Sequence, residues 1–298
     1  MKKLIVILLL FPLLLQAQML DNSKGFAFTG NPFFNEQFIK QNRIKSISGH
    51  LQYKKKGDLI RASKYINQYK FDGNGKLIFS LQTELVGSIE DTVALYFQYD
   101  YRNNLSVLRQ RSSQGYFSTR YIYNDKNQLI REDYYVDVDS TGDNVNNPHF
   151  ERSTFINAEK YSYEVYPNFT KKTYYNNYDF PYMDETIVYN DLGLLEKTER
   201  TIKTTYRKTI TTYEYNGKGW ITKKTVTSES NQEMNEETQF HYDKIGNLVD
   251  EQVYKNGVHK RDLQIIYNSK TGLISYTIDH DLDTELITIL KIDKVEYY

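Results

Sequence analysis

This chain of 298 residues contains no cysteine, only five prolines and one tryptophan. Without cysteine it has no disulfide framework, no thiolate metal site and no cysteine nucleophile. Its 38 basic and 38 acidic side chains cancel, which disfavours a nucleic-acid binder that works by neutralising phosphates. After the first residues, no apolar run approaches the length of a membrane-spanning helix.

Aromatic residues are what the chain has in excess. It carries 28 tyrosines and 15 phenylalanines, far too many for a disordered chain. Yet hydrophobic residues make up only 39% and the mean hydropathy is −0.66, which is low for one thick core. We therefore expect a sheet-rich fold whose apolar surface is mostly tyrosine and is spread thinly.

The first residues resemble an export signal. Lys2 and Lys3 precede a nearly unbroken apolar run over residues 4–15, and a Gln-Ala-Gln sequence follows. This layout predicts a secretory signal peptide over residues 1–17, cleaved after Ala17. A membrane anchor is the alternative, but roughly 12 apolar residues are too few to span a bilayer. We expect an exported protein in the periplasm, at the outer membrane, on the cell surface or outside the cell.

A seven-residue pattern recurs along the chain. It begins with an aromatic residue, has Asp or Asn next in most copies, and ends with Leu or Ile six places later. The aromatic residues are Tyr53, Phe71, Tyr99, Tyr123, Tyr189, Tyr215, Tyr242 and Tyr267, and Gly stands four places later at Gly57, Gly75, Gly193, Gly219 and Gly246. Between Tyr123 and Tyr189 there is room for a further, decayed unit near residues 163–178.

Each copy has the composition of a β-hairpin turn. Asp or Asn at the second place and Gly at the fifth suit a type I turn followed by a left-handed residue. Asn103 and Asn127 replace Gly in two copies, and Asn is among the residues that best tolerate that conformation. Such a turn places the aromatic residue opposite the Leu or Ile six places later. Asn256 and Gly257 predict a two-residue type I′ turn between copies.

The repeat predicts an all-β fold, a meander of antiparallel hairpins. The residue two places before the aromatic is apolar or aromatic in all eight copies, so one sheet face carries a continuous ribbon. Eight or nine units imply sixteen or more strands. Because large twisted sheets curl, we expect a large rolled or spiralling sheet, a partial shell with its aromatic face inward.

The pattern resembles the YD repeat, also called the RHS-like repeat, of secreted bacterial proteins and teneurins. In that family such hairpins wind into a hollow β-shell, so the resemblance implies a single β-domain over residues 44–298. Large toxin-delivering members carry a self-cleaving Asp-Pro-x-Gly-Leu motif. Residues 270–273 (Lys-Thr-Gly-Leu) lack the Asp-Pro, and the chain is too short to enclose a protein cargo. It is similar to the small stand-alone members.

Residues 18–43 carry no repeat. Pro32 followed by Phe33, Phe34, Phe38 and Ile39 predicts a short helix with Pro at its first position. We expect an N-terminal cap over an exposed sheet edge; a docking segment for a partner is the alternative. Residues 285–292 predict a closing strand.

Sequence motifs of catalysis, cofactor binding or metal binding are scarce. We therefore expect that the protein is not an enzyme and has no catalytic residues and no cofactor. No nucleophile elbow, phosphate loop or metal-binding histidine pair is present. The one pattern typical of a metal site is weak. Asp137, Asp139, Thr141 and Asp143 resemble the first half of a calcium loop, but Pro148 stands where its bidentate Glu belongs.

Tyrosines outside the repeat are the candidate interaction residues. They lie where the repeat breaks down: Tyr134, Tyr135, Tyr174, Tyr175 and Tyr178. The leading hypothesis is a non-enzymatic envelope or surface protein that presents a β-repeat surface to a protein partner in an outer-membrane or extracellular assembly. Such a protein would not span the membrane after signal cleavage. The second hypothesis is a carbohydrate-binding module that uses exposed tyrosines, and the third is an uncharacterised hydrolase.

Overall fold

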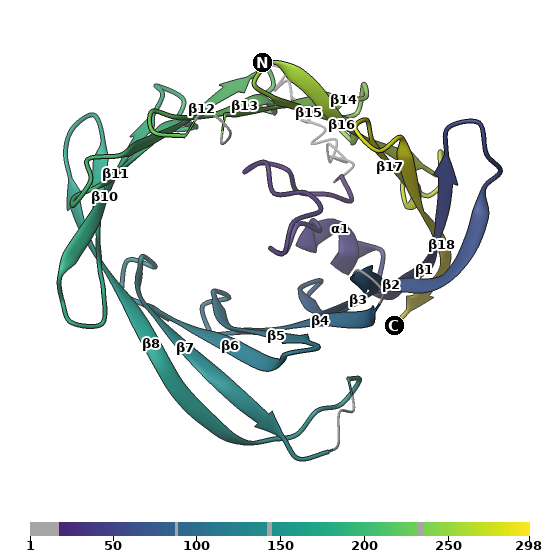
Figure 1. Cartoon of the computed structure of the whole chain (residues 1–298), viewed down its shortest axis with the longest axis horizontal. Coiled ribbons are helices and arrows are strands. Elements are labelled where there is room, and N and C mark those ends of the chain that lie inside the picture. Colours follow the sequence, from purple (N-terminus) through teal and green to yellow (C-terminus); the bar gives the residue numbers. More distant parts are fainter. Residues whose placement is uncertain (1–17, 87–88, 142–144, 232–234) are drawn as a thin grey trace, which may run out of the picture.

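In the computed structural model of the chain, one antiparallel sheet closes into a barrel around the N-terminal segment (Figure 1). The structure describes residues 18–86, 89–141, 145–231 and 235–298. Within these residues there are 18 strands; each pairs with the next along the chain, and β18 pairs with β1. The expected meander of hairpins is confirmed. The expected partial shell is wrong, because pairing of β1 with β18 leaves no sheet edge.

The strands range from 6 residues in β9 to 16 in β8. The helix and the strands are α1 (Glu36–Gln41), β1 (Ile44–Lys55), β2 (Arg61–Phe71), β3 (Leu77–Val86), β4 (Ile89–Tyr99), β5 (Leu105–Ser112), β6 (Gly115–Tyr123), β7 (Leu129–Asp139), β8 (Phe150–Val165), β9 (Thr170–Tyr175), β10 (Pro181–Tyr189), β11 (Leu195–Ile202), β12 (Lys208–Tyr215), β13 (Ile221–Ser228), β14 (Glu236–Tyr242), β15 (Leu248–Lys255), β16 (Val258–Tyr267), β17 (Ile274–Asp281) and β18 (Leu286–Tyr297). The interval between Tyr123 and Tyr189 holds the additional hairpin β8–β9, and the expected closing strand is β18.

The repeat turns adopt the predicted geometry. In six copies the aromatic residue pairs with the Leu or Ile six places later, as Phe71 does with Leu77. In the Tyr267 copy the partner is Ile274, because its glycine comes one place later. The residue before the bulge has a positive φ, whether it is glycine, as at Gly75, or asparagine, as at Asn103. The I′ turn at residues 256–257 also has two positive φ angles.

The predicted hairpin pairing is wrong for the copy at Tyr53. Tyr53 pairs with Arg61 rather than with Leu59, whose side chain is 81% exposed. The physical reason is its position in the barrel. The other seven copies end even-numbered strands and turn at one end of the barrel. Tyr53 lies near the end of β1, so its turn lies at the opposite end.

The repeat tyrosines bind neighbouring hairpins together. Tyr99 donates its hydroxyl hydrogen to the carbonyl oxygen of Leu77 in the preceding hairpin, at 2.8 Å. The same bond joins Tyr123 to Leu105 at 2.9 Å, and it recurs at Tyr163, Tyr215 and Tyr267. The pattern accounts for tyrosine rather than phenylalanine at these positions, because only the hydroxyl can donate to these carbonyls.

The N-terminal segment, residues 18–43, fills part of the lumen, and we call it the plug (Figure 1). Its helix begins after Asn35, which caps the amide of Phe38, and not at Pro32 as predicted. Its expected role as a cap on a sheet edge is also wrong, because the sheet has no edge. The predicted signal peptide, residues 1–17, lies outside the described residues.

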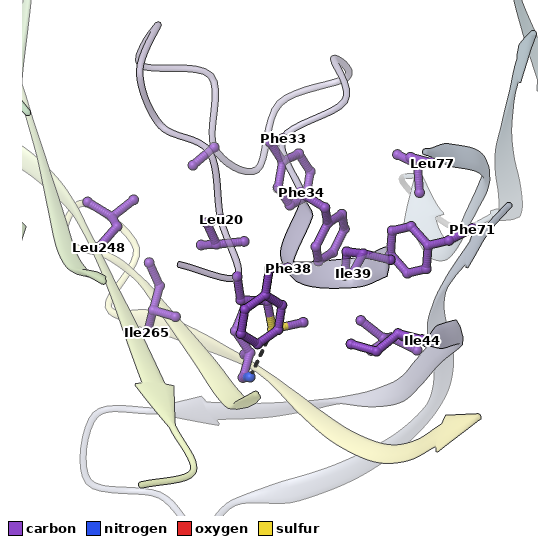
Figure 2. Close-up of a cluster of buried hydrophobic side chains, with 14 of the residues drawn as sticks. Leu20, Phe33, Phe34, Phe38, Ile39, Ile44, Phe71, Leu77, Leu248 and Ile265 are labelled. Atoms are coloured by element: carbon purple, nitrogen blue, oxygen red, sulfur yellow. Dashed lines mark hydrogen bonds between the residues drawn. The ribbon is translucent and has the colours of Figure 1, made fainter. Parts of the chain in front are cut away.

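Apolar burial holds the plug in place. Its buried side chains pack against inward-facing strand residues (Figure 2). From the plug these are Met19, Leu20, Ala27, Phe33, Phe34, Phe38 and Ile39, and from the wall they include Phe71, Leu77, Phe97, Ile221, Phe240, Leu248, Leu263, Ile265 and Ile274. Most of these wall residues occupy the repeat positions that predicted an inward aromatic and aliphatic ribbon. The core of the protein is therefore the contact between the plug and one side of the barrel.

Candidate binding sites of the barrel

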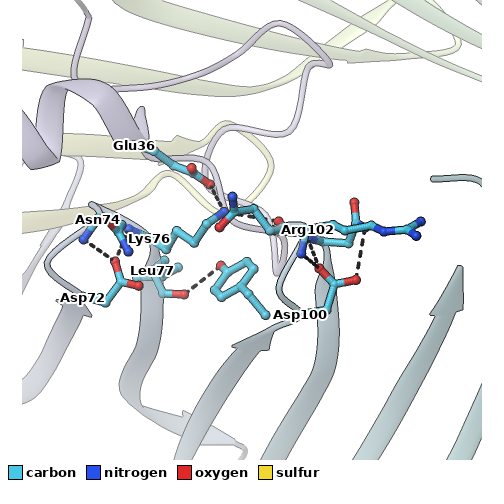
Figure 3. A network of polar contacts seen from close by, with 10 residues as sticks. Glu36, Asp72, Asn74, Lys76, Leu77, Asp100 and Arg102 are labelled. Atoms are coloured by element: carbon cyan, nitrogen blue, oxygen red, sulfur yellow. Dashed lines mark hydrogen bonds and ion pairs between the residues drawn. The ribbon is translucent and has the colours of Figure 1, made fainter. Parts of the chain in front are cut away.

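A polar contact ties the repeat turns to the plug. Lys76, in the turn after β2, is buried and places its ammonium 2.9 Å from a carboxylate oxygen of Glu36 in α1 (Figure 3). The same ammonium lies 4.4 Å from the centre of the Tyr99 ring. Beside it, Gly75 touches the backbone of α1 so closely that a Cβ would lie 2.1 Å from the carbonyl oxygen of Glu36. Specific contacts therefore fix the position of the plug against the turn between β2 and β3.

The lumen keeps free space beside the plug. A cavity of about 440 Å³ lies between residues 25–29 of the plug and the wall of β13–β17, including Asp283 in the turn after β17. A second cavity of about 390 Å³ lies between plug residues 28–33 and the inner faces of β2–β4 and β16–β18. Thr29 and Arg261 line both. These cavities are candidate binding sites, and sequence reasoning did not find them because no contiguous motif lines them.

Tyrosines and carboxylates cover the inner wall of β7–β10. Tyr134 donates to Glu132 at 2.8 Å, and Tyr174 donates to Glu185 at 2.6 Å. Tyr161 and Tyr182 both donate to Glu159. Because each hydroxyl donates its hydrogen to a carboxylate, these tyrosines have no hydroxyl hydrogen left to donate to a ligand.

Cationic side chains also lie on the inner wall formed by β7–β10 and the neighbouring β11. Arg200 donates to Glu185 at 2.8 Å. The ammonium of Lys172 lies 3.7 Å from the Tyr161 ring centre and 4.3 Å from that of Tyr174. Burial lowers the pKa of Lys172 and raises that of Tyr161, whose hydroxyl also donates to Glu159. The wall is a satisfied network of charges and hydroxyls, which favours a structural role.

The five candidate interaction tyrosines do not share one face of the barrel. Tyr134 and Tyr174 belong to the inner network, whereas strand alternation turns Tyr135 and Tyr175 outward. Tyr135 lies under the guanidinium of Arg120, 4.0 Å from its ring centre, and the Tyr175 hydroxyl bonds Ser162. Tyr178 is different, because its side chain is exposed in the loop between β9 and β10.

Tyr178 belongs to an aromatic rim, which we define as Tyr178, Phe180 and Tyr206. Their exposed fractions are 75%, 68% and 78%. Phe180 follows Tyr178 in the β9–β10 loop, and Tyr206 lies in the β11–β12 loop. A backbone hydrogen bond from Lys203 to Tyr182 joins the segments that carry them. Sequence reasoning missed Phe180 and Tyr206, although aromatics inside polar connectors were a usable signal.

The calcium candidates have other partners. Asp137 accepts hydrogen bonds from Arg109 at 2.5 Å and from Ser153 at 2.6 Å. Burial opposes ionisation of Asp137, but these bonds outweigh it and hold its pKa below the usual range. Asp139 accepts from the amide and hydroxyl of Thr141. Asp143 lies outside the described residues, and no three potential metal ligands gather among those described.

The outer face of the barrel carries paired charges. On β11 and β12, Glu199 binds the ammonium groups of Lys197 and Lys208 at 3.0 and 3.1 Å. Asp184 on β10 similarly lies between Lys171 and Lys203. Over the part of the chain that is described, no helix is both long and apolar enough to cross a membrane.

Comparisons with known proteins give distant likenesses. No protein-family model and no curated protein matches the chain. A porin-like protein from Bacteroides uniformis is similar at 14% identity and a TM-score of 0.39, over 84% of this chain and 98% of that one. A porin-like protein from Bacteroides vulgatus matches at 11% identity and a TM-score of 0.29, over 82% and 97%. The Tc holotoxin pore of Photorhabdus luminescens matches at 12% and 0.26, over 74% and 15%. Superpositions this loose do not establish a shared function.

Proposed function

We propose that this protein is an exported, non-enzymatic member of the YD-repeat type that binds a protein partner of the cell envelope through its aromatic rim. The observation that carries the proposal is the exposure of Tyr178, Phe180 and Tyr206 on two adjoining loops. Large aromatics are enriched in protein interfaces, and a group of them left in water favours an interaction site.

The outer face supports a barrel that works in an aqueous compartment. Charged side chains such as Glu199 and Asp184 project from it and are bound to lysines. The buried apolar side chains of the main core face inward onto the plug. Together with the signal-like N-terminus, this arrangement suits a periplasmic or surface protein that does not itself span the membrane.

A protein partner suits the rim better than a glycan does. Carbohydrate sites combine an aromatic platform with convergent polar groups. Phe180 adds no polar group to the rim, and the tyrosine hydroxyls of the inner wall are already bound to carboxylates. Glycan binding through the rim tyrosines remains the alternative that the experiment distinguishes.

The test compares the envelope proteins captured by the wild type with those captured by two variants. In the rim variant, Tyr178, Phe180 and Tyr206 are replaced by Ala. The control variant carries Tyr101→Ala and Leu192→Ala, which remove two exposed side chains at the opposite end of the barrel. Tagged proteins are incubated with detergent-solubilised envelopes of the source cells, and captured proteins are identified and quantified.

We expect the wild type and the control to retain one protein at a constant molar ratio, and the rim variant to lose it. Retention on a glycan array that depends on Tyr178 and Tyr206 would support the carbohydrate alternative instead. A partner held equally by the rim variant would refute the proposed site.

A further inference from the structure

The cavity of about 440 Å³ beside the plug has the size of a small-molecule site. Ala27 of the plug and Phe240 and Val253 of the wall give it apolar sides. Charged side chains of both signs line it as well, among them Lys224 and Glu251. It differs from the tyrosine–carboxylate wall, because its charges are not all satisfied.

Glu251, on β15, is a buried carboxylate without a hydrogen bond. Its exposed fraction is 9%, and its nearest cation is Arg261, with an N–O distance of 3.7 Å, too long for a hydrogen bond. Arg261 is itself bound to Asp279 through two hydrogen bonds of 2.7 and 2.8 Å. Within the described residues no donor bonds the Glu251 carboxylate. Burial raises its pKa. A largely buried carboxylate is costly unless donors reach it.

Lys224, on β13, faces the same cavity, and among the described residues no carboxylate oxygen lies within ion-pair distance of its ammonium; Glu251 attracts it only over a longer distance. Its ammonium lies 5.9 Å from the centre of the Phe26 ring in the plug. Its strand neighbour Lys223 points outward and binds Glu214 at 2.7 Å. The strand therefore holds its outward cation in a close ion pair, whereas its inward cation has no ion pair within the described residues. Glu236, also at the cavity, likewise has no ion-pair partner in the described chain.

We propose that this cavity binds a small zwitterion, an amino acid or short peptide with apolar side chains, whose ammonium group is held by Glu251 and whose carboxylate is held by Lys224. The two charged groups, neither of which has a hydrogen bond among the described residues, lie on the same inner face. Lys224 opposes Thr238 on β14, and Glu251 opposes Phe240 two residues further along the same strand. The apolar groups between plug and wall accommodate the ligand's side chains. This site lies inside the barrel and is separate from the aromatic rim.

The test uses isothermal titration calorimetry of the purified protein with two probes. L-leucyl-L-leucine carries both charges, and N-acetyl-L-leucyl-L-leucinamide carries neither. Each substitution has a matched control at the adjacent, outward-facing residue of the same strand. Glu251→Gln is compared with Asp250→Asn, and Lys224→Met with Lys223→Met.

We expect the charged dipeptide to bind and the blocked one not to bind. Glu251→Gln and Lys224→Met should each weaken binding about tenfold or more, whereas their controls bind as the wild type does. Glu251→Gln should also unfold at the same or a higher temperature, because it removes a largely buried charge that no hydrogen bond satisfies; substitution of a purely structural carboxylate would lower the unfolding temperature. Three results would overturn the proposal. They are no binding of the charged dipeptide, equal binding of the blocked dipeptide, and wild-type affinity in Glu251→Gln or Lys224→Met.

Discussion

Gly75 offers the sharpest test of how the plug sits in the barrel. Its φ is +88°, and a Cβ there would lie 2.1 Å from the carbonyl oxygen of Glu36 and 2.9 Å from the amide nitrogen of Lys40. Gly193 occupies the same place in another repeat, with a φ of +74° and no atom within 4 Å of its Cβ position. The two glycines share the turn conformation but differ in their contact with α1.

The cost of alanine can be worked out separately at each site. A left-handed conformation costs an L-residue about 1–2 kcal/mol, and this applies to both. Overpacking adds about 1–3 kcal/mol at Gly75 alone, because the obstacle is helix backbone and cannot move aside as a side chain can. We expect Gly75→Ala to lower the free energy of unfolding by about 2–5 kcal/mol and Gly193→Ala by about 1–2 kcal/mol.

Urea unfolding followed by Trp220 fluorescence and circular dichroism measures both free energies. Limited trypsin digestion provides a second readout, because Lys24 and Lys40 are already exposed and displacement of the plug should free the backbone around them to enter the protease. Cleavage should be faster in Gly75→Ala than in Gly193→Ala. Equal destabilisation by the two substitutions, with equal digestion rates, would refute the packing of α1 against this turn.

Two further predictions concern hydrogen bonds that define the fold. Tyr99→Phe should lower the free energy of unfolding by about 0.5–1.5 kcal/mol, because the Leu77 carbonyl loses its donor. Tyr189→Phe should change it little, since Tyr189 is exposed; equal losses in urea unfolding would contradict the proposed role of the hydroxyl. The second prediction concerns Asp137, whose pKa is lower in the folded state than its unfolded value of about 3.9. Its ionisation therefore stabilises the fold at pH values above the unfolded pKa. This stabilisation is lost as the pH falls through the folded pKa. Between about pH 4 and 2 the wild type should therefore lose stability more steeply than Asp137→Asn, and parallel curves of unfolding free energy against pH would contradict the contribution of the Arg109–Asp137 pair.

The local geometry of the repeat follows from the sequence alone. Asp72 accepts hydrogen bonds from the amides of Asn74 and Lys76, and Phe71 pairs with Leu77. All of these partners lie within seven residues, so the residue types at each place suffice to predict the turn. The inward ribbon follows as well, because side chains alternate along a strand. The Tyr53 copy shows the limit: a similar local pattern does not tell at which end of the sheet a turn lies.

Tertiary structure alone decided the closure of the barrel, the place of the plug and the candidate sites. Pairing of Ile47 with Val295 joins nearly opposite ends of the chain, and whether a twisted sheet closes depends on the accumulated geometry of all its strands. The short-range pattern at residues 31–39 indicated a helix but contained nothing about the lumen that receives it. That Lys224 and Glu251 face one cavity without a hydrogen bond among the described residues is visible only once closure brings β13, β15 and the plug together. Hydrogen-bond partners are a property of the assembled interior and not of any single strand.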